Sequence, residues 1–543
     1  MAYLKVERKK SGSYLRIMES YRNESGKPTS RVLFSLGKLE NYKPAELRSI
    51  GVKLFELGGG ELKGLLEGDL QELGRFNYGY QKVYGYLLEH FGLKHLFERL
   101  GKKHKLQFSL YHSVLLMLLE RLQDPCSKLG NYRHQNEYVQ LPDLSLQHLY
   151  RALDKLAKYQ ELIQEHIFQV GRDLFNQQLD VVFYDVTTFY FSSEVEVEGA
   201  LRQKGFGKDG KVGKTQILFC MLIDADKNPI GYQLFKGNTY EGDTYKTALD
   251  QLKHRYAIDK VIVVADRGML SKNNLAVTRE KGYEFLIGER LKSLPLKQKD
   301  TLLNLQNYQH EWSYTDTSGA PVLIRYTTIK VEGKTIIGTY SSKRAKKDKA
   351  DRDEKLLKAQ KLLERPSSIN QKASRFFLKA EKGQSYILDE EKIKRAEQYD
   401  GFLAISTNNN SLPVSQLLDQ YKQLFKIEHS FRTFKSHLET RPMFHWTDQR
   451  IEGHICLCYI AFALQNTLLQ KVNNSENLPD GKAANISEKQ LRETLDKMQV
   501  SLIENQEQRS YLRSMPTEKE QIILSELGLK SIPPIQKEET FAI

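Results

Sequence analysis

The sequence of 543 residues predicts an α/β core that is interrupted by a β-rich insertion and preceded by a helical domain and a small N-terminal β unit. Two observations predict this arrangement. Between residues 176 and 294, short β-branched and aromatic runs of strand length alternate with amphipathic helical runs. After a β-rich and then charged stretch at 295–400, helical runs at 401–474 complete the core. The core is therefore expected in two parts, 176–294 and 401–474.

Residues 1–60 predict the small β unit. Two alternating runs, 14–18 and 31–36, flank a polar and turn-rich stretch at 23–28, which is typical of a β-hairpin. Basic residues surround these runs, so this unit is compatible with a DNA contact.

Residues 61–175 predict a helical, DNA-binding domain. Ser145 precedes a helical run at 146–156 in the position of an N-cap. Short helices with basic, aromatic and amide side chains suit a helix-turn-helix-like reader of DNA. A plain helical bundle that packs on the next domain fits the same pattern, and the sequence leaves both open.

The first part of the core predicts a mixed sheet with helices. Three hairpin-linked strands come first, then a helix, then two further strands. The expected strands are 181–191, 215–223, 230–235, 260–265 and 282–290, and the expected helix is 243–256.

Two carboxylates stand out in these strands. Asp185 lies among apolar and aromatic neighbours, where an acid needs a partner or a raised pKa. Asp266 ends an apolar strand just before a turn at Gly268, and ligands collect at the carboxyl ends of strands in such sheets. Two structural explanations of Asp266 remain open: a pair with Arg267, or a cap on the turn.

The insertion at 295–400 is expected to contain strands at 322–331 and 333–340 and then a charged helix at 343–363. Trp312 precedes them. It is expected in the core, as is usual for a single Trp in a strand, and stacking on an extruded base is the alternative.

A helix around residues 421–438 carries the most informative pattern. At about 100° per residue, Tyr421, Glu428, Arg432 and Lys435 fall in one narrow stripe beside the apolar face. A carboxylate at the edge of a buried surface is costly unless something binds it. Together with Asp185 and Asp266, Glu428 would supply the hard oxygen ligands that Mg²⁺ prefers. An amphipathic core helix with charge pairs on its flank is the structural alternative.

Bulk properties agree with a polyanionic partner. The chain has 82 Lys and Arg against 68 Asp and Glu, a formal net charge of +14, but the basic residues are spread over the sequence. Four cysteines are too few for a disulfide framework. No apolar run approaches about 20 residues, so a soluble cytoplasmic protein without a membrane segment is expected. Residues 475–543 are predicted to form a polar, helical tail that dimerises or is partly disordered.

Three motifs in order resemble the DDE transposases of prokaryotic insertion sequences. The first two are Asp185-Val-Thr-Thr in its strand and Ala265-Asp-Arg-Gly-Met at its turn. The third is the spacing Tyr421-x6-Glu428-x6-Lys435, similar to the branch with a Tyr-Arg-Glu-Lys (YREK) signature helix. Leu424 stands where that signature has Arg. The resemblance covers residues 176–470 and implies a ribonuclease-H-like catalytic core with a β-rich insertion that helps to clamp the transposon end.

The resemblance implies metal-dependent DNA cleavage and strand transfer. Asp185, Asp266 and Glu428 would hold two Mg²⁺ ions, with Mn²⁺ as a substitute, and activate a water or a 3′-hydroxyl. Tyr421, Arg432 and Lys435 would bind DNA phosphates, with Arg432 replacing the cation absent at position 424.

Partners implied by the resemblance are double-stranded DNA, at element ends and at the target, and a second copy of the chain in a DNA-bound homodimer. Two alternatives stay open. One is a nuclease of the same fold that only hydrolyses DNA. The other is an inactive DNA-binding descendant, which would be expected to lack one of the three acids.

Overall fold

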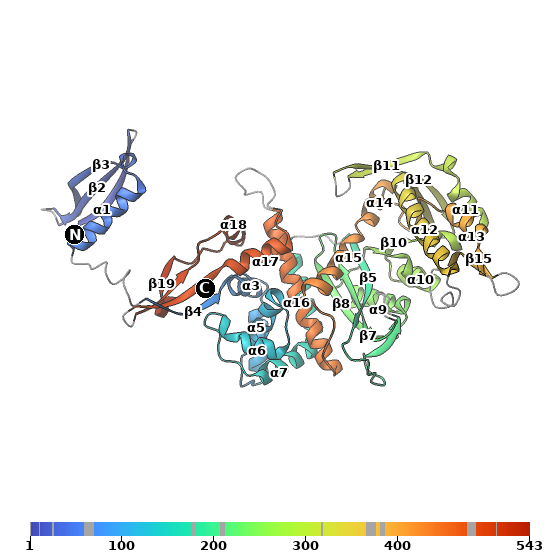
Figure 1. Cartoon of the computed structure of the whole chain (residues 1–543), viewed down its shortest axis with the longest axis horizontal. Helices are drawn as coiled ribbons and strands as arrows, with labels where there is room; N and C mark the ends of the chain where they lie inside the picture. Colours follow the sequence, from blue (N-terminus) through green and yellow to red (C-terminus); the bar gives the residue numbers. More distant parts are fainter. Residues whose placement is uncertain are drawn as a thin grey trace. The chain divides into compact units, whose positions relative to one another are not determined.

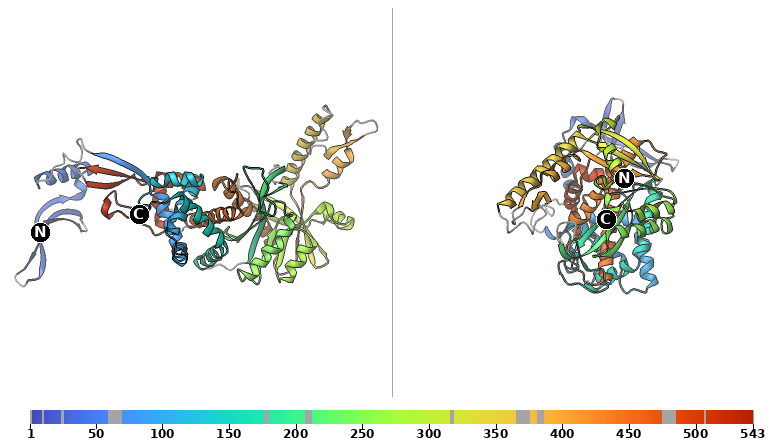
Figure 2. Two further views of the ribbon diagram at one scale, coloured as in Figure 1. Left: turned by 90° about the horizontal axis from the view of Figure 1, so that it is seen from below. Right: turned by 90° about the vertical axis from the view of Figure 1, so that its right-hand side faces the viewer.

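The computed structural model describes residues 2–9, 11–23, 26–58, 70–175, 180–206, 212–315, 319–364, 376–380, 386–474, 485–505 and 508–542. The chain divides into two compact units. The first comprises Met1–Phe76, Gln499–Met515 and Ile532–Ile543, and the second comprises Asn77–Met498 and Pro516–Ser531. Figure 1 labels their helices and strands, and Figure 2 gives two further views.

The N-terminal part of the first unit is a three-stranded antiparallel sheet with one helix. Its strands β1 (Ala2–Lys9), β2 (Gly12–Arg22) and β3 (Pro28–Lys38) pair in sequence order, and α1 (Pro44–Leu57) follows. The predicted hairpin is confirmed as β2 and β3, which pair from Tyr14–Lys38 to Arg22–Pro28. The sequence pattern did not reveal β1, whose residues are almost all exposed and carry no clear alternation in burial.

A second sheet of this unit joins distant parts of the chain. Its four strands lie in the order β19, β18, β17, β4. Their bounds are β4 (Gln71–Asn77), β17 (Gln499–Asn505), β18 (Gln508–Arg513) and β19 (Ile535–Lys537). The prediction of a purely helical tail is therefore wrong for residues 499–513, because Val500 and Tyr511 are buried in strands that pair with each other and with neighbouring strands.

The helical part of the second unit surrounds one long buried helix, α16 (Asp448–Asn473), which contacts α3, α5, α7, α8 and α18. The helices are α3 (Gly79–His90), α4 (Leu93–Lys103), α5 (Leu110–Gln123), α6 (Lys128–His134), α7 (Leu146–Lys158), α8 (Gln160–Phe175), α17 (Glu488–Lys497) and α18 (Glu518–Glu526). The expected cap is confirmed, since Ser145 accepts a hydrogen bond from the backbone N–H of His148.

Helix α16 bears on the expectation that the chain has no membrane segment. Among the described residues it alone is long and apolar enough to cross a membrane, with a mean hydropathy of 1.3 over its most apolar window. Since 78% of that window is buried inside the protein, α16 is accounted for as a core helix. Cys456 and Cys458 lie within it and are buried and free.

The core of the second unit is a ten-stranded mixed sheet. Nine strands follow the order β11, β12, β13, β16, β10, β9, β5, β7, β6, and β8 pairs with β7 outside this path. The strands of the α/β core are β5 (Val181–Tyr190), β6 (Gln203–Phe206), β7 (Val212–Ile223), β8 (Pro229–Lys236), β9 (Ile262–Ala265), β10 (Glu284–Gly288) and β16 (Phe402–Thr407). Helices α9 (Glu241–His254) and α10 (Lys272–Glu280) share one hydrophobic core with β5, β7, β9 and β10. The predicted order of strands and helix is confirmed.

The insertion extends this same sheet. Strands β11 (His310–Thr315), β12 (Pro321–Val331) and β13 (Lys334–Tyr340) form an antiparallel run that continues through β16. The predicted charged helix is α12 (Ser342–Leu363). The remaining elements of the segment are α11 (Leu296–Leu303), β14 (Leu378–Ala380), β15 (Tyr386–Leu388) and α13 (Glu390–Glu397).

Candidate active site

Asp185 and Asp266 follow paired residues of two neighbouring parallel strands. Strand β5 pairs with β9 in the register Tyr184 to Ala265, and the next residue of each chain segment is the acid. Neighbouring strands are about 4.8 Å apart. Tyr184 and Ala265 both belong to the hydrophobic core under α9 and α10. Because side chains alternate across a strand, both acids are directed to the opposite face of the sheet.

Backbone N–H groups hold one oxygen of each acid. The N–H of Val186 donates to Asp185 Oδ1 at 2.7 Å, and the N–H of Gly268 donates to Asp266 Oδ1 at 2.7 Å. Asp266 thus caps the following turn, which was one of the structural explanations left open by the sequence. A Cβ at position 268 would lie 2.9 Å from Asp266 Oδ1, so glycine permits this close approach. Among the described residues nothing is bound to Oδ2 of Asp266, so this oxygen remains for a ligand.

The prediction of one continuous, regular helix at 421–438 is wrong. The structure has α14 (Val414–Lys422), then α15 (Phe425–Arg432), then a π-helical turn (Thr433–His437). Between them the backbone tightens, since the N–H of Leu424 bonds to the carbonyl of Tyr421 and that of Ile427 to Leu424. Bonds of the i to i+3 type tighten the turn, and the π turn widens it. A uniform 100° rotation therefore does not relate Tyr421, Glu428 and Lys435.

Helix α15 nevertheless lies on the face of the sheet that carries Asp185. It contacts β5, and the ring of Phe431 meets that of Phe219 of β7 edge-on at 6.0 Å. In the following turn, Phe434 stacks with Phe189, which shares the Asp185 side of β5. Burial of Phe431 and Phe434 anchors the helix, while Glu428 stays exposed at its flank.

Tyr421 links the acids to nearby cations. The pKa of its phenol is raised to about 12, mainly by burial and then by the charge of Asp266. Arg344 and Arg267 act to lower this pKa, and Glu428 adds a smaller rise. The phenol therefore lies within electrostatic range of two of the three acids. The hydroxyl of Tyr421 also lies at the end of β10. A Cβ built on Gly288 would be 2.6 Å from the oxygen of this hydroxyl.

Arg432 occupies the position that the sequence predicted within α15. It is exposed one helical turn after Glu428, so the two side chains share a face. Within the described ranges neither has an ion-pair partner, and the alternative Arg432–Glu428 pair is not observed. Leu424 is half-buried, and Lys435 is half-buried on the π turn.

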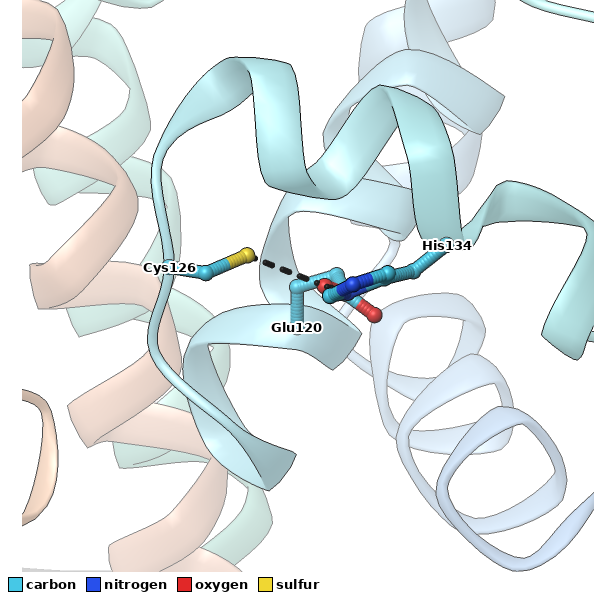
Figure 3. A group of neighbouring side chains, drawn as sticks. All are labelled: Glu120, Cys126 and His134. Carbon is cyan, nitrogen blue, oxygen red and sulfur yellow. Dashed lines mark hydrogen bonds and ion pairs between the residues drawn. The ribbon is translucent and has the colours of Figure 1, made fainter.

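The tightest group of metal-type ligands lies elsewhere. In the described part of the chain, Glu120, Cys126 and His134 form the one group of three whose ligand atoms all lie within 4.8 Å of one another (Figure 3). Glu120 is already bound by the hydroxyl of Tyr138 at 2.8 Å, by Nδ1 of His134 at 2.9 Å and by the thiol of Cys126 at 3.2 Å. Burial raises the pKa of the Cys126 thiol to about 12, which disfavours the thiolate that a metal needs. This group is a hydrogen-bonded junction of α5 and α6.

Asp185, Asp266 and Glu428 do not form such a group, because their carboxylate oxygens do not all lie within 4.8 Å of one another. Two ions in a shared site are about 3.5–4 Å apart, so a site for two ions does not require its carboxylates to meet this limit.

Three features of the site escaped the sequence analysis. Arg267 and Arg344 face Tyr421 from the Asp266 turn and from α12, and Gly288 makes room for its hydroxyl. Of these three residues, only Arg267 could have been suspected from the sequence, because it follows Asp266. Arg344 and Gly288 belong to elements that are distant in sequence. Trp312 was expected in the core, but it is half-buried and donates from Nε1 to Asp419 of α14 at 3.2 Å.

Comparison with known proteins gives two family matches. Residues 177–464 match the model of the transposase DDE domain, and residues 4–60 match that of the N-terminal domain of IS1634 family transposases. Comparison with curated proteins gives no match.

Among solved structures, the chain is similar to a piggyBac transposase synaptic complex with hairpin DNA, with 10% identity, a TM-score of 0.36, and 77% of this chain and 76% of that chain covered. It is also similar to the Mos1 transposase paired-end complex with the left transposon end, with 14% identity, a TM-score of 0.15, and coverage of 32% and 58%. Since both TM-scores lie below 0.5, neither likeness bears on the function.

Proposed function

The chain belongs to the transposases with a DDE domain, and from this premise we propose that Asp185, Asp266 and Glu428 form its catalytic centre. The family match covers just over half of the chain and includes all three acids. The observation that carries the proposal is the β5–β9 register, which sets Asp185 and Asp266 side by side on the face where α15 lies.

Members of this family use divalent metal ions, and we propose two Mg²⁺ ions here, with Mn²⁺ as a substitute. Carboxylate oxygens are the ligands that Mg²⁺ prefers. When bound, the ions would activate the attacking oxygen and neutralise charge on the scissile phosphate. Val186 and Gly268 hold one oxygen of Asp185 and Asp266, respectively, which orients the carboxylates before any ligand binds.

We propose that the cations and the phenol near the acids position the DNA phosphates. Because the pKa of Tyr421 is raised to about 12, its hydroxyl stays protonated at neutral pH and can donate to a phosphate oxygen. Lys435 would neutralise a backbone phosphate next to the cut.

Arg432, exposed beside Glu428, would bind a phosphate in place of the arginine that Leu424 replaces. Arg432→Ala should then slow cleavage strongly with little change in melting temperature. Unaltered cleavage, or a loss explained by a lower melting temperature, would refute this role.

The DNA partner we propose is the duplex at the two ends of the element and at the target. Joining two ends at one target requires two active sites held together, so we expect a homodimer on DNA. Light scattering of the DNA-bound protein should give twice the chain mass of 62.9 kDa, after subtraction of the DNA. A DNA-bound particle that contains a single chain and still cleaves would argue against the dimer.

The test uses a duplex that carries the inverted repeat flanking the gene. The wild-type chain should cleave at the end of the repeat and join it to target DNA with Mg²⁺ and not with EDTA. Asp185→Ala should abolish both steps and leave the dissociation constant for the duplex nearly unchanged. Asp180→Ala, an exposed acid just before β5, is the matched control and should behave as wild type.

Two outcomes would overturn the proposal in different ways. Cleavage that persists in EDTA or in Asp185→Ala would exclude the metal-binding centre. Mg²⁺-dependent cleavage without any joined product would favour the hydrolytic nuclease of the same fold.

A further inference from the structure

A groove of about 830 Å³ adjoins the proposed catalytic centre. The residue after Asp266, Arg267, lines its near end, and the loop after β10, helix α12 and the segment before β16 form its walls. Arg290 of the loop donates from Nε to the carbonyl of Arg267 at 3.4 Å, which ties the two walls at that end. The groove thus begins at the turn that holds Asp266.

The charges near Tyr421 also connect the groove to the acids. Arg267 and Arg344, both in the groove lining, lower the pKa of this phenol, while Asp266 and Glu428 raise it. Arg344 also pairs with Asp348 at 3.5 Å, so Arg267 is the cation that connects the groove to the acids.

Part of the charge in the groove is structural. Arg352 is buried and binds both oxygens of Asp400, at 2.5 and 2.6 Å. Buried Glu289 pairs with Lys334. Asp348 accepts from the backbone N–H of Gly401 at 3.0 Å. These contacts hold α12 against the segment before β16, and they tie β13 to the segment after β10.

Four other cations remain for a ligand. Within the described ranges Arg267, Arg290, Lys292 and Lys355 have no carboxylate partner, and of the acids lining the groove only Asp351 is likewise unpaired. Lys292 and Lys355 are exposed. The excess of unpaired positive charge favours an anionic occupant, and four cations in one lining suit a chain of phosphates.

Aromatic side chains line the groove together with these cations. The ammonium of Lys292 lies 5.0 Å from the ring centroid of Tyr399, and Phe376 is 60% exposed although it is apolar. A basic groove with aromatic rings is the arrangement that binds single-stranded nucleic acid, because bases stack on the rings while phosphates meet the cations. Its volume is in the range of about 300–1,000 Å³ that suits compact ligands.

We propose that a single DNA strand leaving the catalytic centre lies in this groove. Its phosphates would bind Arg267, Arg290, Lys292 and Lys355, and a base would stack on Tyr399 or Phe376. The proposal rests on the proposed function, and it adds an exit path for one strand that the three acids alone do not define.

The test compares two duplexes that carry the same inverted repeat. One is blunt, and the other has a single-stranded flank of about five nucleotides, long enough to occupy part of one strand-binding site. For the wild-type chain, fluorescence anisotropy should show tighter binding of the flanked duplex by about tenfold, the effect of roughly one stacked base. Lys292→Ala/Lys355→Ala should remove this gain and reduce the salt slope by about 0.7 per lost phosphate contact.

The matched control is Lys346→Ala/Lys394→Ala. Lys346 is exposed on the side of α12 turned away from the groove, and Lys394 is exposed on α13. This variant loses the same charge and should keep the gain. All three proteins should melt at similar temperatures, because the four lysines are exposed.

Equal gains in affinity for the flanked duplex in both double variants would overturn the proposal. So would a gain that inorganic phosphate removes completely at concentrations at which the blunt duplex stays bound. Photo-cross-linking from an iodouracil in the flank should reach Tyr399 or Phe376, and cross-links confined to other elements would also overturn it. Cleavage of the blunt duplex that depends on Asp185 reports separately on the proposed function, so the two failures are distinguishable.

Discussion

Tyr421 is the residue at which the proposed chemistry and the surrounding protein meet. It adjoins two acids and two arginines, and its raised pKa keeps it a hydrogen-bond donor across the neutral range. The sequence predicted Tyr421 as a site residue from helical spacing, and the structure gives a different reason for its place: contact with the end of β10. Distant elements set this contact, so no local pattern could have shown it.

A single methyl group at position 288 should disturb this contact. In Gly288→Ala the new Cβ would lie 2.6 Å from the Tyr421 hydroxyl and 3.1 Å from the backbone nitrogen of Arg267. We expect cleavage to fall by about tenfold to a hundredfold, because small misplacements are costly for catalysis. The double variant Gly288→Ala/Tyr421→Phe should melt at a higher temperature than Gly288→Ala, since the clashing oxygen is gone. A lower melting temperature of the double variant would contradict this account of the packing.

At the scale of elements, the helix of the signature motif shows what a sequence pattern can and cannot predict. The prediction of an apolar face beside the stripe is confirmed, since Ile427, Phe431 and Phe434 are buried. The division into α14, α15 and a π turn was not, because i+3 and i+5 bonding leave no mark in a pattern of apolar residues. The residues that share one regular helix, Glu428 and Arg432, keep their predicted relation.

The segment after the signature helix has a packing role that a matched pair of glycine variants can measure. A Cβ on Gly453 of α16 would lie 2.2 Å from the carbonyl oxygen of Leu153 of α7, whereas a Cβ on Gly85 of α3 would meet nothing within 4 Å. Gly453→Ala should destabilise the protein by about 1–3 kcal/mol or more, as overpacking does. Gly85→Ala should stabilise it by about 0.5–1 kcal/mol, since alanine suits a helix better. Denaturant unfolding of both variants gives the comparison, and equal effects would contradict the close packing of α7 and α16.

At the scale of the whole molecule, the order of strands in the α/β core followed from the sequence, and the extent of the sheet did not. Hairpin neighbours such as β7 and β8 are local and were predicted. The pairing of β13 with β16 joins Tyr340 to Phe402 across the charged helix, and it makes the insertion part of one sheet. The sheet of β4 with C-terminal strands is equally non-local. Alternation within a strand predicts that it is buried on one face and does not name its partner.

The charge of the whole chain predicts how DNA binding responds to salt. With a net charge of +14, binding of an element-end duplex should release counterions at several phosphates, each contributing about −0.9 to the slope of log K against log salt. A slope steeper than about −3 is expected. Asp185→Ala should keep this slope, because an acid makes no favourable phosphate contact. A dissociation constant that barely changes between low and physiological salt would contradict phosphate binding.

The central claim is that Asp185, Asp266 and Glu428 act as one metal-dependent centre, and the rate of strand cleavage in four variants tests it most directly. Groups that act as a unit are strongly non-additive. Asp185→Asn, Asp266→Asn and Glu428→Gln should each reduce Mg²⁺-dependent cleavage to the level of the triple variant, while all four bind the element-end duplex as wild type does. Cleavage by Glu428→Gln at a rate near that of the wild-type chain would contradict the claim, because it would leave α15 without a role at the centre.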